Sequence, residues 1–93
     1  MPDMIYQLEQ IITNRKENPS EESYTSSLFS KGRHKIAQKV GEEATEVVVA
    51  SLAEGREEQI GELADLFYHT LVLMADLDIT LEDINVELEK RHK

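Results

Sequence analysis

Apolar residues recur every three or four positions along most of the chain, which is the spacing of one helix face. The first such stretch covers residues 3–16, with the apolar positions Met4, Ile5, Leu8, Ile11 and Ile12. Asn18-Pro19 ends it, because proline cannot continue a helix and restricts the residue before it. In the serine-rich segment that follows, Ser23 is a candidate N-cap for a short helix over residues 23–29.

The same spacing predicts two longer helices, over about residues 33–53 and 57–75. The apolar positions of the first are Ile36, Val40, Val47 and Ala50, and those of the second are Ile60, Leu63, Ala64, Phe67, Leu71 and Met74. Gly55 lies where a glycine C-cap ends the first of these helices. A turn at this glycine would let the two helices fold back on each other in antiparallel fashion.

The last helix begins at a capping box, in which Asp83 follows Thr80 by three residues. Its apolar face consists of Leu81, Ile84 and Leu88. The whole pattern predicts an all-α chain of four to five helices. Its 93 residues and 10.6 kDa permit a single domain over residues 1–93, because a second core cannot be built from so short a chain. The core is thin, so we expect a second copy to help bury it.

Composition excludes several classes of function. Ten Lys and Arg against nineteen Asp and Glu give a formal net charge of −9, which disfavours nucleic acid as a partner. The chain has no cysteine, which rules out disulfides, a thiolate nucleophile and cysteine-ligated zinc. No apolar run approaches the ~18 residues of a membrane span, and no signal peptide is visible. We therefore expect a cytoplasmic protein with no membrane partner.

Two acidic pairs carry the candidate chemistry: Glu43 with Glu46, and Glu62 with Asp65. Each pair is spaced i, i+3, which places both carboxylates on one side of a helix about one turn apart. If the two long helices fold back at Gly55, a rise of ~1.5 Å per residue puts all four carboxylates within about one turn of the same height. We expect the four to converge.

Four carboxylates in one place repel one another and raise one another's pKa unless a cation lies among them. Ligation by oxygen alone selects a hard cation, and Mg²⁺ held by a few carboxylates and water is the ordinary case, with Mn²⁺ as a substitute. Substrate phosphates usually complete such a site, which indicates phosphoryl chemistry. The alternative interpretation is that both pairs belong to solvated helix faces.

A basic segment precedes the first acidic pair. No Asp or Glu occurs between Glu22 and Glu42, and the cations of this window are Lys31, Arg33, Lys35 and Lys39. All four are candidates for binding a polyanionic substrate. Lys39 lies one turn before Glu43 and is the one we most expect to face the site. Arg33 and Lys35 are explained equally well as an exposed helix start with ion pairs.

His69 follows Asp65 by four residues and therefore shares its helix face. It is a candidate to ligate a metal, to orient a carboxylate from behind or to carry a proton. Tyr24 is expected to be a core or interface residue. The sequence contains no glycine-rich phosphate loop and no recognisable Ser-His-Asp motif, so water activated by a metal is the remaining nucleophile.

Four motifs, in order, resemble the phosphoribosyl-ATP pyrophosphohydrolase family, a branch of the all-α MazG-like nucleotide pyrophosphohydrolases. They are Ser23-Tyr24-Thr25, Gly32, Lys39-Val40-Gly41-Glu42-Glu43-Ala44-Thr45-Glu46 and Glu62-Leu63-Ala64-Asp65-Leu66-Phe67-Tyr68-His69. The resemblance covers roughly residues 5–92. It implies a MazG-like helical bundle, a homodimer with helices shared across the interface, and Mg²⁺ bound by Glu43, Glu46, Glu62 and Asp65.

The resemblance also implies a small-molecule nucleotide substrate. The reaction would be hydrolysis of 1-(5-phosphoribosyl)-ATP to 1-(5-phosphoribosyl)-AMP and pyrophosphate, the second step of histidine biosynthesis. Glu42 and Glu46 are the candidate proton acceptors for the attacking water. Some relatives are fused to a zinc-dependent cyclohydrolase, and we expect the pyrophosphohydrolase to stand alone here. Two alternatives stay open: a MazG-type enzyme that clears other nucleoside triphosphates, and a non-catalytic acidic helical module that binds a protein.

Overall fold

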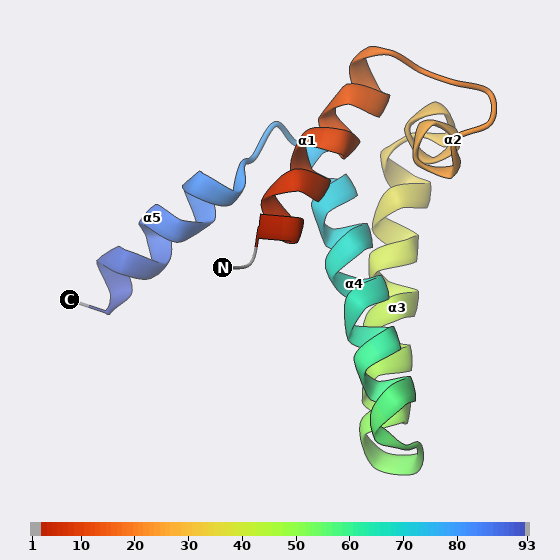
Figure 1. Ribbon diagram of the computed structural model, residues 1–93, viewed down its shortest axis with the longest axis vertical. Coiled ribbons are helices and arrows are strands. Elements are labelled where there is room, and N and C mark those ends of the chain that lie inside the picture. The colour runs from red at the N-terminus through yellow and green to blue at the C-terminus, as the bar shows by residue number, and fades with distance from the viewer. Residues whose placement is uncertain (1–2, 93) are drawn as a thin grey trace.

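The computed structural model describes residues 3–92, and this part of the chain forms five helices. They are α1 (Asp3–Glu17), α2 (Tyr24–Lys31), α3 (Arg33–Ala53), α4 (Arg56–Asp76) and α5 (Leu81–Arg91) (Figure 1). No strand occurs within residues 3–92, so the all-α prediction is confirmed. No described helix has both the length and the apolar character needed to cross a membrane.

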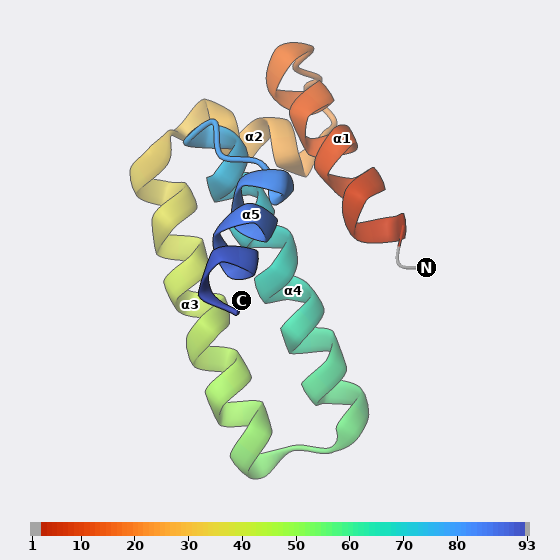
Figure 2. The same cartoon turned by 90° about the vertical axis from the view of Figure 1, so that its left-hand side faces the viewer.

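The helices α3 and α4 form a long antiparallel hairpin, which is the most extensive helix pair in the structure (Figure 2). α1 packs against α4 and α2, and α2 also contacts α3. The small buried core lies where these four helices meet and consists of Ile12, Leu28, Ile36, Leu71 and Val72. The hairpin therefore extends well beyond the part of the molecule that the core stabilises.

The joint between α2 and α3 is a single residue, Gly32. It caps the end of α2 and the start of α3, and its φ of +96° lies in the left-handed region that favours glycine. At the other end of α2, the side chain of Ser23 accepts a hydrogen bond from the backbone N–H of Ser26, as the predicted N-cap requires. The predicted short helix over residues 23–29 is confirmed, although it continues to Lys31.

The predicted role of Gly55 as a C-cap is wrong. Glu54 is the C-cap of α3, in an extended conformation, and Gly55 is the N-cap of α4 with a φ of −86°. Glu54 and Gly55 are both extended, so the chain leaves α3 without the left-handed residue that a glycine C-cap supplies. Gln59 compensates, because its side-chain amide donates to the carbonyls of Ala50 (3.2 Å) and Glu54 (3.0 Å).

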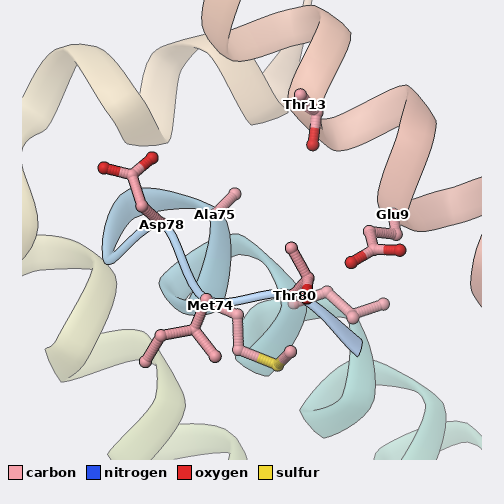
Figure 3. Close-up of a pocket in the computed structure, with 8 residues that line it drawn as sticks. Glu9, Thr13, Met74, Ala75, Asp78 and Thr80 are labelled. Carbon is pink, nitrogen blue, oxygen red and sulfur yellow. The ribbon is translucent and has the colours of Figure 1, made fainter. Parts of the chain in front are cut away.

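α5 contributes no residue to the core and projects to one side of the hairpin (Figure 1). Its start is well defined, since the predicted capping box of Thr80 and Asp83 is present. The Glu9 carboxylate of α1 also accepts a hydrogen bond of 2.8 Å from the backbone N–H of Leu81. Glu9 lines a small cavity of about 150 Å³ between α1, the end of α4 and the turn into α5 (Figure 3). This cavity contains none of the predicted site residues.

A broad apolar surface remains open on α1, α4 and α5. Three shallow grooves of about 280, 290 and 370 Å³ cross it. Ile60 and Phe67 are 55% and 52% exposed, although the helix pattern places them on a core-facing stripe. We call this region the α1–α4–α5 surface; it is formed by Met4, Ile5, Leu8, Ile60, Leu63, Phe67, Leu81, Ile84 and Leu88. Large exposed apolar patches of this kind mark interaction sites.

Candidate active site

Three carboxylates meet in the seam between α3 and α4. One oxygen each of Glu43, Glu62 and Asp65 lies within 4.8 Å of the other two. Glu43 is buried, Glu62 is half-buried and Asp65 is exposed, so the cluster runs from the interior of the hairpin to its surface. We call these three residues the carboxylate cluster. The structure thus brings together three of the four expected metal ligands at the height that the helical rise indicated.

The fourth expected ligand, Glu46, lies at the edge of this cluster. Its side chain is exposed, and it is close enough to Glu62 to affect the titration of that residue. It does not belong to the group of three whose oxygens are all mutually close. Glu46 therefore adjoins the cluster from the solvent side.

Glu62 is in an unfavourable electrostatic position. Burial raises the pKa of its carboxyl group, and the neighbouring carboxylates of Glu46, Asp65 and Glu43 raise it further. Its Oε1 atom is buried and has no hydrogen-bond partner among the described residues. A buried acceptor without a donor is costly, and a divalent cation is the partner that would satisfy it. The all-oxygen donor set fits Mg²⁺ or Mn²⁺.

Lys39 is the cation that the structure brings to the cluster. Its Nζ lies 3.3 Å from Oε2 of Glu43 and 3.6 Å from Oε1 of Glu42. Partial burial lowers the pKa of Lys39, but the hydrogen bond to Glu43, together with Tyr24 and Glu42, leaves the pKa above its ordinary value. Lys39 therefore stays charged beside the carboxylates and can bind an anionic group.

The other three candidate cations do not reach the cluster. Arg33 binds the end of α4 instead: its Nε lies 2.6 Å from Oδ2 of Asp76, and its Nη2 donates to the backbone carbonyl of the same residue. Arg33 precedes Glu43 by ten residues, or ~15 Å along a helix, which explains the separation. Lys35 is near enough to Glu42 to affect its pKa, and Lys31 is exposed in the last turn of α2.

Glu42 is exposed and lies outside the carboxylate cluster. Gln38 donates a hydrogen bond of 2.7 Å to its Oε2. This bond lowers the pKa of Glu42 below its ordinary value, and the charges of Lys39 and Lys35 act in the same direction. A carboxylate with a lowered pKa is a weaker proton acceptor.

His69 lies behind the cluster and does not belong to it. The side chain is only 7% exposed. Nδ1 lies 2.8 Å from the backbone carbonyl oxygen of Asp65, and Nε2 lies 3.1 Å from the hydroxyl of Tyr24. Tyr24 itself is 50% exposed, so it is not a core residue of this chain, and the expected interface position stays a prediction. The only signal in the sequence for this contact is the Ser23-Tyr24-Thr25 motif.

Comparison with known proteins finds relatives over nearly the whole chain. The sequence matches the profile of the phosphoribosyl-ATP pyrophosphohydrolase family over residues 5–92. The phosphoribosyl-ATP pyrophosphatase of Bacillus mycoides is 48% identical over 92 residues, which are 99% of this chain and 86% of that protein. The corresponding protein of Metallosphaera sedula is 52% identical over 93 residues, the full length of both.

A third relative is the histidine biosynthesis bifunctional protein HisIE of Oceanobacillus iheyensis. It is 54% identical over 89 residues, which are 96% of this chain but 41% of that protein. The chain thus corresponds to one part of that larger protein. Both the profile match and the relatives span nearly the whole of the sequence. The chain belongs to the phosphoribosyl-ATP pyrophosphohydrolase family.

Proposed function

We propose that the chain hydrolyses phosphoribosyl-ATP to phosphoribosyl-AMP and pyrophosphate, in the histidine biosynthesis of the cytoplasm. Membership of the family and the names of the relatives support this activity. The observation that carries it is the carboxylate cluster, with its buried and unpartnered oxygen on Glu62. Such a cluster suits a divalent ion, and a divalent ion suits a triphosphate substrate.

Glu43, Glu62 and Asp65 would hold Mg²⁺, and Glu46 is placed to complete the set from the solvent side. Bound there, the ion would supply Lewis-acid stabilisation of charge on the triphosphate and would make water a better nucleophile. The chain's own acids would offset the charge of the ion and fix it in the seam of the α3–α4 hairpin.

Two further roles fall to side chains of α3 and of the end of α2. Glu46 is exposed beside Glu62 and is the better placed of the two candidate bases to accept a proton from the attacking water. Glu42 is the weaker candidate, because its hydrogen bond from Gln38 lowers its pKa. Lys39 binds a phosphate at the cluster, and Lys31 and Lys35 add positive charge at the approach.

The α1–α4–α5 surface supports a homodimer. A second copy that covered Ile60 and Phe67 would complete a core that one chain leaves thin. Helices of both copies would then share this interface, with α5 as the most exposed element.

Pyrophosphate release from phosphoribosyl-ATP, measured with Mg²⁺ and again with excess chelator, tests the proposed activity. We expect turnover with Mg²⁺ and its loss in the chelator, with recovery when Mg²⁺ is restored. Parallel reactions with dCTP, dUTP and ATP identify the substrate, and faster release from any of these would point to a MazG-type enzyme. If no nucleotide released pyrophosphate, the chain would be a non-catalytic module and the proposal would be wrong.

A further inference from the structure

Two adjacent hydroxyl contacts attach the start of α2 to α4. The hydroxyl of Tyr24 lies 3.1 Å from Nε2 of His69, and the hydroxyl of Thr25 bonds that of Tyr68. Two consecutive residues of α2 are thus paired with two consecutive residues of α4. The Tyr24 and Tyr68 rings are stacked, with centroids 6.2 Å apart. The two contacts are alike in kind and in the helices that they join.

The chemistry of His69 fixes the direction of its bond to Tyr24. Nδ1 lies 2.8 Å from the backbone carbonyl oxygen of Asp65, which can only accept, so Nδ1 carries the hydrogen and donates. In a neutral imidazole Nε2 is then an acceptor, and the hydroxyl of Tyr24 must donate to it. The tyrosine oxygen keeps its lone pairs free to accept from another group.

The other ring nitrogen of His69 links this contact to the carboxylate cluster. Nδ1 donates to the backbone carbonyl of Asp65, and a side-chain oxygen of Asp65 lies within 4.8 Å of those of Glu43 and Glu62. One series of polar contacts therefore runs from the backbone of Asp65 through His69 to Tyr24. It links α4 to α2, and its α4 end lies at the cluster.

We propose that Tyr24 is a positioning residue of the active site. By donating to His69, it fixes the start of α2 against the turn of α4 that carries Asp65, a member of the carboxylate cluster. The effect on substrate binding rests on the proposed function. The hydrogen bond between Tyr24 and His69 does not, so the two can be tested separately.

Thr25 and Tyr68 supply a matched control. Their contact joins the same two helices through hydroxyl groups, and it involves neither His69 nor Asp65. Tyr24→Phe and Tyr68→Phe each remove one phenolic oxygen from the same junction. A purely structural role predicts the same result for both variants.

Steady-state kinetics with phosphoribosyl-ATP and Mg²⁺ separate the two roles. We expect Tyr24→Phe to raise KM about five-fold, the size typical of one lost hydrogen bond, with kcat within about two-fold of the wild type. Tyr68→Phe should leave both constants within about two-fold while lowering the unfolding midpoint to a similar extent. In a His69→Gln background, Tyr24→Phe should change KM no further, because the imidazole to which the tyrosine donates is gone. Equal KM values for the two single variants, or full additivity with His69→Gln, would overturn the proposal.

A readout without substrate tests the hydrogen bond itself. In ¹⁵N NMR at about pH 8, above the ordinary imidazole pKa, we expect His69 to be protonated at Nδ1. The Nε2 signal should shift in Tyr24→Phe and stay in place in Tyr68→Phe. An unchanged Nε2 signal in Tyr24→Phe would refute the bond even if the enzyme were active, whereas an inactive wild type with the expected spectrum would refute the proposed function. If Tyr24→Phe did not fold, His69→Gln would test the same bond from α4, with an unchanged KM as the contrary result.

Discussion

The two sides of α4 differ in how complete they are within one chain. On the side that faces α3, Glu62, Asp65 and His69 meet partners from α2 and α3. On the opposite side, Ile60 and Phe67 are exposed and line shallow grooves together with residues of α1 and α5. The polar side of α4 finds its partners within one chain, while much of its apolar side stays exposed. The candidate active-site residues therefore belong to one helical hairpin. The stability of the protein, in contrast, is expected to depend on a second copy of the chain.

The first test of this difference alters the polar side of α4 and its α3 partners alone. We expect Glu43→Gln to reduce turnover by more than about 100-fold, because the amide removes one charge from the buried end of the cluster. Helix content by circular dichroism should be unchanged. Glu57→Gln, which makes the same substitution on the exposed first turn of α4, is the control and should retain activity. Full activity in Glu43→Gln would remove the metal-site assignment.

The second way is to alter the apolar side alone. Phe67→Asp places a charge in the α1–α4–α5 surface, where it would be buried without a partner in a dimer. We expect the molecule to sediment as a monomer and to unfold at a lower temperature. Gln10→Asp adds the same charge to an exposed polar site on α1 and should leave assembly unchanged. A wild type that is already monomeric at micromolar concentrations would contradict the expected homodimer.

The third test compares Lys39 and Arg33, two cations of α3 that make different contacts. Lys39→Gln should raise KM for phosphoribosyl-ATP about ten-fold, because a charge-assisted hydrogen bond to phosphate is lost. Arg33→Gln should leave KM within about two-fold, since the guanidinium binds Asp76. That pair, whose arginine is largely exposed, contributes about 1 kcal/mol or less to stability. Equal increases in KM would mean that the substrate reaches as far as Arg33.

The smallest expected effect concerns the stability of the metal-free protein. The pKa of Glu62 is raised above its ordinary value of 4.5, so its ionised form opposes folding at neutral pH. We expect Glu62→Gln in excess chelator to unfold at a slightly higher temperature than the wild type at pH values above the raised pKa. This advantage should fade as the pH falls towards 4.5, because the wild-type carboxyl then becomes neutral too. An advantage that persisted in acid would point to a cause other than charge.

The sequence was sufficient for what depends on position within a helix. A regular rise per residue placed Glu43, Glu62 and Asp65 at one height, and the structure brings their oxygens within 4.8 Å of one another. The capping box at Thr80 and the N-cap at Ser23 were also predicted, because their partners lie only three residues away. Local spacing determines all of these features.

Contacts between distant helices could not be read in this way. The bond between Tyr24 and His69 spans 45 residues, and that between Arg33 and Asp76 spans 43. Each depends on how α2 and α3 lie against α4, and helical periodicity does not specify that arrangement. Gly55 shows a local limit, since a glycine near a helix boundary suits an N-cap as well as a C-cap.

The single-residue elbow at Gly32 has a consequence for how this chain tolerates change. Nothing lies within 4 Å of where a methyl group would stand, so crowding does not restrict the position, but its φ of +96° does. Any other residue would tend to reopen the angle between α2 and α3 and carry Tyr24 away from its neighbours. A residue without a functional group can thus be as sensitive to mutation as one that touches substrate, and a defect there would look like a loss of affinity.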